Sequence, residues 1–139
     1  MDTRNIRYKR ESLTDQKHLW STITYTHKEK LENELDCKVR IINGTEDHVH
    51  LLFLLSPNFT LKDIFHNVKG ESSHWINQSN LLEYKFAWQT GYGAFSVSES
   101  MVKGVEKYIA NQKEHHKKMT YKEEIDLFIK KYGLKIINR

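Results

Sequence analysis

The feature that most constrains this chain is the segment at positions 48–55, which reads HVHLLFLL. Side chains of a β-strand alternate between the two faces of its sheet. After its first residues this segment is apolar on both faces, which is typical of a central strand covered by helices. The sequence therefore predicts a sheet with this strand inside it and helices over at least one face.

The neighbouring segments supply further elements. Residues 38–42 are predicted to pair with residues 48–55 as a hairpin, because the connection NGTED contains a glycine. A third strand is expected at about residues 92–97. Apolar spacing and capping residues predict four helices, at about residues 12–35, 60–76, 98–117 and 120–132.

The order of these elements is helix, strand, strand, helix, strand, helix, helix. This order predicts an α+β fold, a ferredoxin-like or RRM-like antiparallel sheet packed by helices, whose first strand is weak or missing. Residues 1–11 are highly charged and offer only residues 5–8 for that strand. With 139 residues, no internal repeat and no linker, the chain is expected to be one domain, residues 1–139.

Composition narrows the class of protein. The single cysteine, Cys37, excludes an intramolecular disulfide and a cysteine-rich zinc site. No apolar run reaches the length of a membrane span, and residues 1–20 lack the apolar core of a signal peptide. We therefore expect a soluble cytoplasmic protein without a membrane partner. The 22 basic and 18 acidic residues leave a net charge of +4, which permits nucleic-acid binding without identifying it.

His48 and His50 form the first constellation that could carry chemistry. Residues i and i+2 of a strand point to the same side, so the two imidazoles could hold one divalent cation from one face. Such a site needs a third ligand. The alternative is a pair of ordinary histidines at the solvated start of a strand, and the spacing alone favours that alternative.

Tyr108 and Gln112 form the second constellation. They lie four residues apart in the predicted third helix and are expected to share a face away from its apolar stripe. In the functional interpretation, Gln112 supplies a neutral oxygen ligand to a metal and Tyr108 is a nucleophile. In the alternative, Tyr108 borders an amphipathic helix and Gln112 is solvated.

Two further segments have simpler explanations. Residues 113–118, KEHHKK, are expected to form a solvated, cationic helix end suited to phosphate contacts rather than a metal site. The aromatic residues within 86–98 are explained by packing, with base stacking as the less favoured alternative. Five lysines are candidates for contacts with DNA phosphates: Lys69, Lys103, Lys107, Lys113 and Lys117.

Four of these segments occur in one order along the chain, at residues 43–55, 68–73, 88–98 and 108–117. In this arrangement the chain closely resembles the single-tyrosine HUH transposases of the smallest bacterial insertion sequences. That family includes the REP-associated tyrosine transposases. The resemblance extends from about residue 12 to residue 134.

The resemblance implies a metal-dependent single-strand DNA endonuclease and strand transferase. The strand histidines and the helix glutamine of the family, matched here by His48, His50 and Gln112, bind Mg²⁺ or Mn²⁺. The tyrosine matched by Tyr108 attacks a DNA phosphate and becomes joined to the 5′ phosphate. Members recognise hairpins of single-stranded DNA and act as homodimers, so the protein is expected at the nucleoid when DNA-bound.

The family usually begins with a strand at the sheet centre, which residues 1–11 do not suggest. Either the chain fills that position otherwise, for example with a partner's segment, or the reading frame is truncated. Two alternative functions from other classes also stay open. One is a catalytically impaired or domesticated protein that binds hairpin nucleic acid on the same fold. The other is a metal-dependent hydrolase that uses the two histidines with water, although no carboxylate is evident as its base.

Overall fold

The computed structural model of the chain describes residues 2–7, 16–44, 48–80, 85–88, 92–111 and 121–138. Its strands are β1 (Asp2–Arg7), β2 (Lys38–Gly44), β3 (His48–Leu54), β4 (Gly93–Ser96) and β5 (Lys135–Asn138). Its helices are α1 (Gln16–Glu29), α2 (Leu61–Gln78), α3 (Val102–Ala110) and α5 (Tyr121–Tyr132), with a π-helical turn η1 (Lys30–Glu34) and a 3-10 turn η2 (Glu99–Met101).

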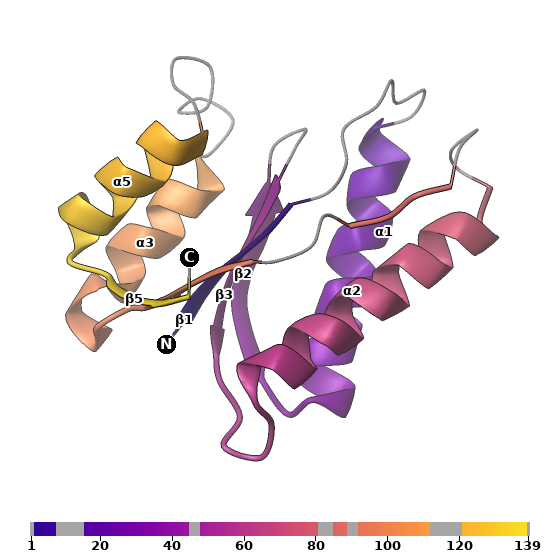
Figure 1. Cartoon of the computed structure of the whole chain (residues 1–139), viewed down its shortest axis with the longest axis horizontal. Helices are drawn as coiled ribbons and strands as arrows, with labels where there is room; N and C mark the ends of the chain where they lie inside the picture. Colours follow the sequence, from indigo (N-terminus) through magenta and orange to yellow (C-terminus); the bar gives the residue numbers. More distant parts are fainter. Residues whose placement is uncertain are drawn as a thin grey trace.

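The strands form one antiparallel sheet in the order β2-β3-β1-β4-β5. Helices α3 and α5 lie on one side of this sheet and α1 and α2 on the other (Figure 1). The predicted α+β class, an antiparallel sheet packed by helices, is confirmed. The position of β3 inside the sheet follows from its two apolar faces.

The expectation of a weak or missing first strand was wrong. Residues Asp2–Arg7 form β1, which pairs with β3 on one side and with β4 on the other. Pairing with a strand on each side outweighs the low strand propensity of a charged segment, because propensity for strands depends strongly on context. The central position is therefore filled by the chain itself. A partner's segment is not needed between β3 and β4.

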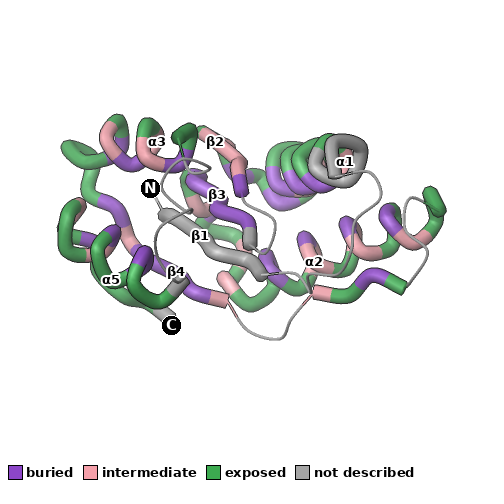
Figure 2. The backbone as a smooth tube through the Cα atoms, turned by 90° about the horizontal axis from the view of Figure 1, so that it is seen from above, coloured by how far each residue is buried: buried purple, intermediate pink, exposed green. Residues whose placement is uncertain are grey.

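Each face of β3 contributes to a separate apolar core. Val49, Leu51 and Phe53 face α1 and α2, whereas Leu52 faces α3 and α5. Buried positions recur along β3 and on the helices at each side of the sheet (Figure 2). The chain thus has two cores that share the backbone of one strand, and the alternation of β3 decides which side chains enter each.

Two helix ends lie where the sequence predicts them, and one lies elsewhere. The side chain of Thr60 accepts a hydrogen bond from the backbone N–H of Asp63 at 3.1 Å, as expected of an N-cap. Helix α5 ends at Tyr132, and Gly133 follows it with a φ of +60°, as expected of a glycine after a helix end. The third helix, predicted over residues 98–117, begins as the turn η2, and α3 ends at Ala110; residues 112–117 lie outside the described part of the chain.

The aromatic segment before β4 is part of the core, as the packing interpretation predicted. Phe86 is buried, and Trp88 and Tyr92 pack against the core beneath α1 and α2. The indole N–H of Trp88 donates to the hydroxyl of Ser72 at 2.8 Å, and Tyr92 stacks on Phe65. Residues 89–91 lie outside the described part of the chain.

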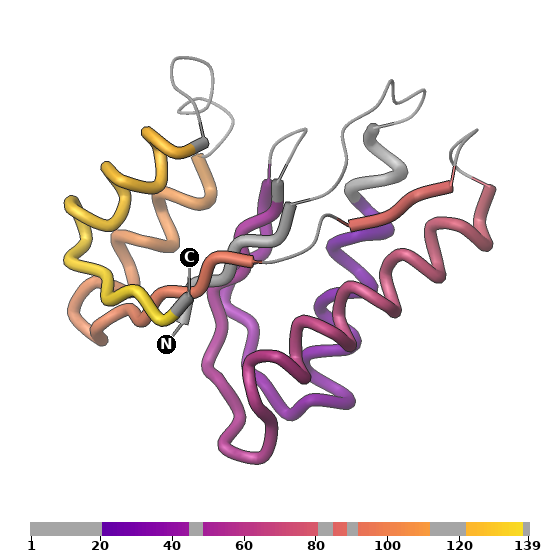
Figure 3. The backbone as a smooth tube through the Cα atoms, in the orientation of Figure 1, coloured from indigo at the N-terminus to yellow at the C-terminus, as the bar shows by residue number. Residues whose placement is uncertain are grey.

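Strand β5 was not expected from the sequence. It has four residues, follows α5 after a short turn, and pairs with β4 at the sheet edge. The paths of α5 and β5 beside α3 can be followed in Figure 3. Across the described segments, no helix is long and apolar enough to cross a membrane.

One polar group in the first core has no partner. His27 on α1 is fully buried against Trp88, and neither of its ring nitrogens has a hydrogen-bond partner among the described residues. Burial lowers the pKa of His27 to about 3, because the charged imidazolium would lose its hydration. The unfolded chain binds a proton at this residue near pH 6.5, so acid favours unfolding.

We predict that His27 makes the free energy of unfolding fall by about 2 kcal/mol between pH 7 and pH 5. In His27→Phe this part of the pH dependence should disappear, as measured by urea unfolding at several pH values. His74→Phe, a change at an exposed position of α2, is the matched control and should keep the slope of the wild type. A His27→Phe protein with an unchanged slope would contradict the prediction.

Candidate functional site

Strand β3 directs His50 toward α3 and α5. Because Val49 and Leu51 enter the core under α1 and α2, the alternation of the strand turns His50 to the opposite face. Its side chain has an exposed fraction of 0%, and its ring lies 6.0 Å from that of Phe128 on α5. The alternative prediction, an ordinary histidine pair at the solvated start of a strand, is therefore wrong for His50. His48 begins the same strand, and its side chain lies outside the described residues.

Helix α3 is fixed to the adjacent strand β2 by two polar contacts. Arg40 on β2 forms an ion pair with Glu106 on α3 at 3.1 Å. The side-chain amide of Asn43 donates to the backbone carbonyl of Ile109 at 2.8 Å, and so holds the last turn of the helix. Asn43 lies directly opposite His50 in the sheet register. These contacts place the end of α3 over the part of the sheet that contains His50.

Tyr108 lies in that last turn of α3. It is half-buried, and its ring stacks on Phe128 with centroids 4.6 Å apart and an interplanar angle of 23°. The tyrosine was expected to stand away from the core, but it packs against the core formed with α5. Its hydroxyl donates a hydrogen bond to Oε1 of Glu124 at 3.0 Å.

Glu124 joins the tyrosine to the histidine. It lies on α5 with an exposed fraction of 0%, and its Oε1 is 3.9 Å from Nε2 of His50. Two side chains, one from α3 and one from β3, thus approach one carboxylate oxygen of a residue on α5. We call these three residues the Tyr108–Glu124–His50 cluster.

The surroundings of Tyr108 keep its phenol protonated. Burial raises the pKa of Tyr108 well above its ordinary value, and the charge of Glu124 and the hydrogen bond to it raise the pKa further. A neutral phenol attacks weakly unless its proton is removed as the new bond forms. The cluster contains a carboxylate at hydrogen-bond distance from that proton.

Glu124 was missed in the sequence because helix periodicity was used only to find apolar residues. Glu124 is four residues before Phe128 and therefore lies on the buried face of the helix. A carboxylate on a buried face is rare unless it is paired. A search for charged residues on predicted apolar stripes would have found it.

The other predicted site residues are only partly brought together. Helix α3 ends at Ala110, so Gln112 is not on a described helix face with Tyr108, and Lys113 and Lys117 also lie outside the described residues. Lys103 and Lys107 are exposed on α3, on the same helix as Tyr108. Lys69 is on α2, across the sheet, and burial lowers its pKa. Among the described lysines, Lys69 therefore does not share a surface with Lys103 and Lys107.

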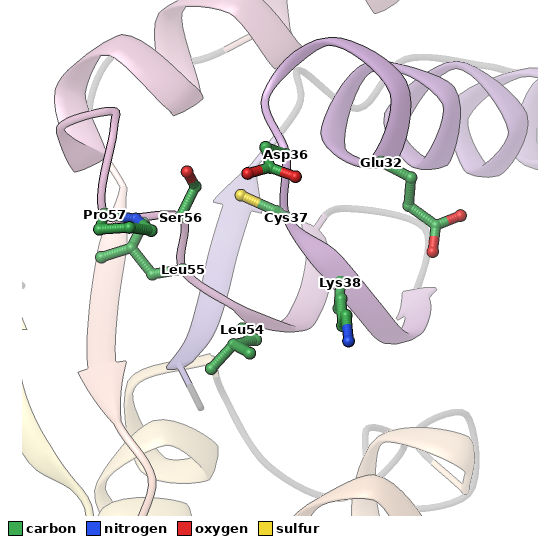
Figure 4. Close-up of a pocket in the computed structure, with 8 residues that line it drawn as sticks. All are labelled: Glu32, Asp36, Cys37, Lys38, Leu54, Leu55, Ser56 and Pro57. Carbon is green, nitrogen blue, oxygen red and sulfur yellow. The ribbon is translucent and has the colours of Figure 1, made fainter.

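A separate hollow lies at the other end of β3. Its volume is about 410 Å³, and it contains no residue of the Tyr108–Glu124–His50 cluster (Figure 4). No histidine or tyrosine lines it, so the hollow includes none of the histidines and tyrosines that the sequence singles out as site candidates. It is lined by Glu32, Asp36, Cys37, Lys38, Leu54, Leu55, Ser56 and Pro57.

Several solved structures share the fold of this chain, including the following two. One is described as a "putative transposase" from Deinococcus radiodurans R1, with a TM-score of 0.60 and 20% identity over 81% of this chain and 90% of that one. The other is a REP-associated tyrosine transposase bound to a REP hairpin, with a TM-score of 0.64 and 10% identity over 85% of this chain and 68% of that one. A search of curated proteins gives no match.

The comparison with protein families identifies the chain itself. The family model described as "Transposase IS200 like" matches residues 4–112. This match includes β1 from Arg4 onward, the strand with His48 and His50, and the helix with Tyr108. It ends before α5 and Glu124. The chain belongs to the family of IS200-like transposases.

Proposed function

We propose that this transposase cleaves and rejoins single-stranded DNA at hairpin ends through a 5′-phosphotyrosine formed by Tyr108. The observation that carries the proposal is the convergence of Tyr108 and His50 on one carboxylate oxygen of Glu124. Three groups thus lie together on one face of the sheet. They are the proposed nucleophile Tyr108, the imidazole of His50, which is a common metal ligand, and the carboxylate of Glu124, which can accept a proton. The REP hairpin bound by a protein of the same fold supports a hairpin substrate.

The buried imidazole of His50 fits a divalent cation, because imidazole is a common metal ligand. The side chains of His48 and Gln112 lie outside the described residues. Among the described residues there is no group of three or more histidine, cysteine or acidic side chains that could hold a metal. We propose that His48, His50 and Gln112 hold Mg²⁺ or Mn²⁺. The ion would offset the negative charge that develops on the phosphate.

The chain's own residues have distinct tasks in this proposal. Phe128 supports the ring of Tyr108 from one side, and Asn43 fixes the turn that carries it. Lys103 and Lys107 are exposed on the same helix and are proposed to contact the DNA backbone. A homodimer remains part of the proposal, although β1 now occupies the position that was expected to recruit a partner.

A metal-dependent hydrolase is the second candidate. The sequence offered no evident carboxylate as the base of a hydrolase. In the structure Glu124 lies beside His50 and could take that role. In a hydrolase this carboxylate would activate water, and no protein–DNA bond would form. The non-catalytic binder loses the observation that favoured it, because the first strand is present.

The first prediction from this proposal concerns Tyr108→Phe. Wild-type protein with labelled hairpin DNA and Mn²⁺ should give a protein–DNA band on a denaturing gel, and Tyr108→Phe should give none. The variant loses a hydrogen bond to a buried carboxylate, so its free energy of unfolding should fall by about 1.5–3 kcal/mol while it stays folded. Tyr92→Phe, in the other core, is the control and should keep the band.

A band that persists in Tyr108→Phe refutes the nucleophile. Cleaved DNA without any covalent band in the wild type supports the hydrolase instead. DNA binding without cleavage supports the non-catalytic binder.

The second prediction concerns the metal. Calorimetry should show Mn²⁺ binding to the wild type and at least a tenfold weaker affinity in His48→Ala/His50→Ala, because two ligands are removed. Since His50 is buried, circular dichroism must accompany the measurement, and His48→Ala alone should already weaken binding. His66→Ala/His74→Ala, at exposed positions of α2, should bind like the wild type. Equal affinity in all variants would exclude the histidine site.

The third prediction concerns the lysines of α3. In Lys103→Gln/Lys107→Gln the salt dependence of affinity for single-stranded DNA should weaken, its logarithmic slope falling by about 1.4 if each lysine neutralises one phosphate. Fluorescence anisotropy at several salt concentrations measures the slope. Lys62→Gln/Lys85→Gln removes the same charge at exposed positions elsewhere and should keep the slope. Equal slopes in both double variants would exclude α3 from the DNA interface.

A further inference from the structure

We propose that Glu124 is the general base of the reaction and accepts the proton of Tyr108 as the phenol oxygen attacks the DNA phosphate. This inference rests on the proposed function and adds to it a catalytic residue from α5. Glu124 follows the end of the family match at residue 112, so the family assignment says nothing of its role.

The geometry gives Glu124 direct access to the reacting atom. The Tyr108 hydroxyl donates to Oε1 of Glu124 at 3.0 Å, which is within the range required of a general base. The contact is not local in sequence, since it joins α3 to α5 across 16 residues. It therefore depends on the packing of the two helices rather than on the geometry of a single turn.

The packing around the pair fixes both partners. Tyr108 stacks on Phe128, which follows Glu124 by one helical turn on the same face of α5. Tyr132, one further turn along, meets both rings edge-on. At Gly104 on α3, an added Cβ would lie 3.0 Å from the ring of Tyr132, so the absent side chain permits the close approach of the helices. The acceptor is thus held beside the donor before DNA arrives.

The proposed step balances in atoms and charge. The O–H bond of Tyr108 breaks and its proton passes to Oε1 of Glu124, which becomes a carboxylic acid. The phenol oxygen forms a bond to phosphorus, the bond from phosphorus to the 3′ oxygen breaks, and the leaving 3′ oxygen takes a proton from solvent. In rejoining, the oxygen of a 3′ hydroxyl forms a bond to phosphorus and releases its proton to solvent. The bond from phosphorus to the phenol oxygen breaks, and Glu124 returns its proton to the phenol oxygen.

Two other roles for Glu124 make different predictions. As a metal ligand beside His50, it would be needed for Mn²⁺ affinity. As a purely structural acceptor, it could be replaced by glutamine, whose side-chain carbonyl still accepts a hydrogen bond but does not take up a proton at neutral pH. Glu124→Gln therefore separates proton transfer from positioning.

The test measures single-turnover formation of the covalent protein–DNA adduct with labelled hairpin DNA and Mn²⁺. In Glu124→Gln the rate should fall by about 10²–10⁴-fold, the usual contribution of a general base. Affinities for Mn²⁺ and for DNA should stay within about threefold of the wild type, as measured by calorimetry and anisotropy. Glu123→Gln, the same change at the exposed neighbouring residue, should react at the wild-type rate.

Three outcomes overturn the inference. A Glu124→Gln rate equal to the wild type leaves only a structural role, and a tenfold or greater loss of Mn²⁺ affinity makes Glu124 a ligand. If Glu124→Gln does not fold, Glu124→Asp is measured instead. Its shorter carboxylate should slow adduct formation without changing the affinity for Mn²⁺ or for DNA. The third outcome that overturns the inference is a Glu124→Asp protein that forms the adduct as fast as the wild type. Absence of an adduct in the wild type refutes the proposed function itself. This outcome differs from failure of the inference alone, in which the wild type still forms the adduct.

Discussion

The burial of β3 on both faces is the constraint on which the rest of the structure depends. Its apolar residues enter two cores, one under α1 and α2 and one under α3 and α5. Because neighbouring side chains of a strand must take opposite faces, the core contacts of Val49 and Leu51 determine where His50 points. A shift of one residue in register would turn His50 toward α1 and α2, away from Tyr108. The same strand register therefore determines both the packing of the two cores and the position of the candidate site.

The sequence predicted the elements whose signals are local. The two apolar faces of β3, the Thr60 cap and the Gly133 stop each depend on residues within one or two turns. It failed for β1, because a charged segment becomes a strand only when β3 and β4 offer their backbone groups to it. It failed for β5 for a related reason, since four residues at an edge have no distinctive period.

The candidate site shows the same division between local and tertiary information. Strand alternation and the order of motifs were enough to choose His50 and Tyr108, but they could not show that both side chains are packed in the core beside α5. The place of Glu124 in the site could be predicted only if the helix that covers that face of the sheet were known. Only the tertiary contact between α3 and α5 turns a charged residue on an apolar stripe into a partner for Tyr108.

A carboxylate buried among aromatic rings is costly to the fold, since an ionised group loses hydration that few partners replace. Apolar residues at the position of Glu124 would pack against Phe128 without this cost. The cost is offset in part by the hydrogen bond from Tyr108, which is stronger than a neutral one when the acceptor is charged. The same hydrogen bond and the same burial keep the phenol protonated in the resting protein. The interaction that stabilises the end of α3 thus also holds the hydroxyl of the proposed nucleophile, Tyr108, in its protonated form.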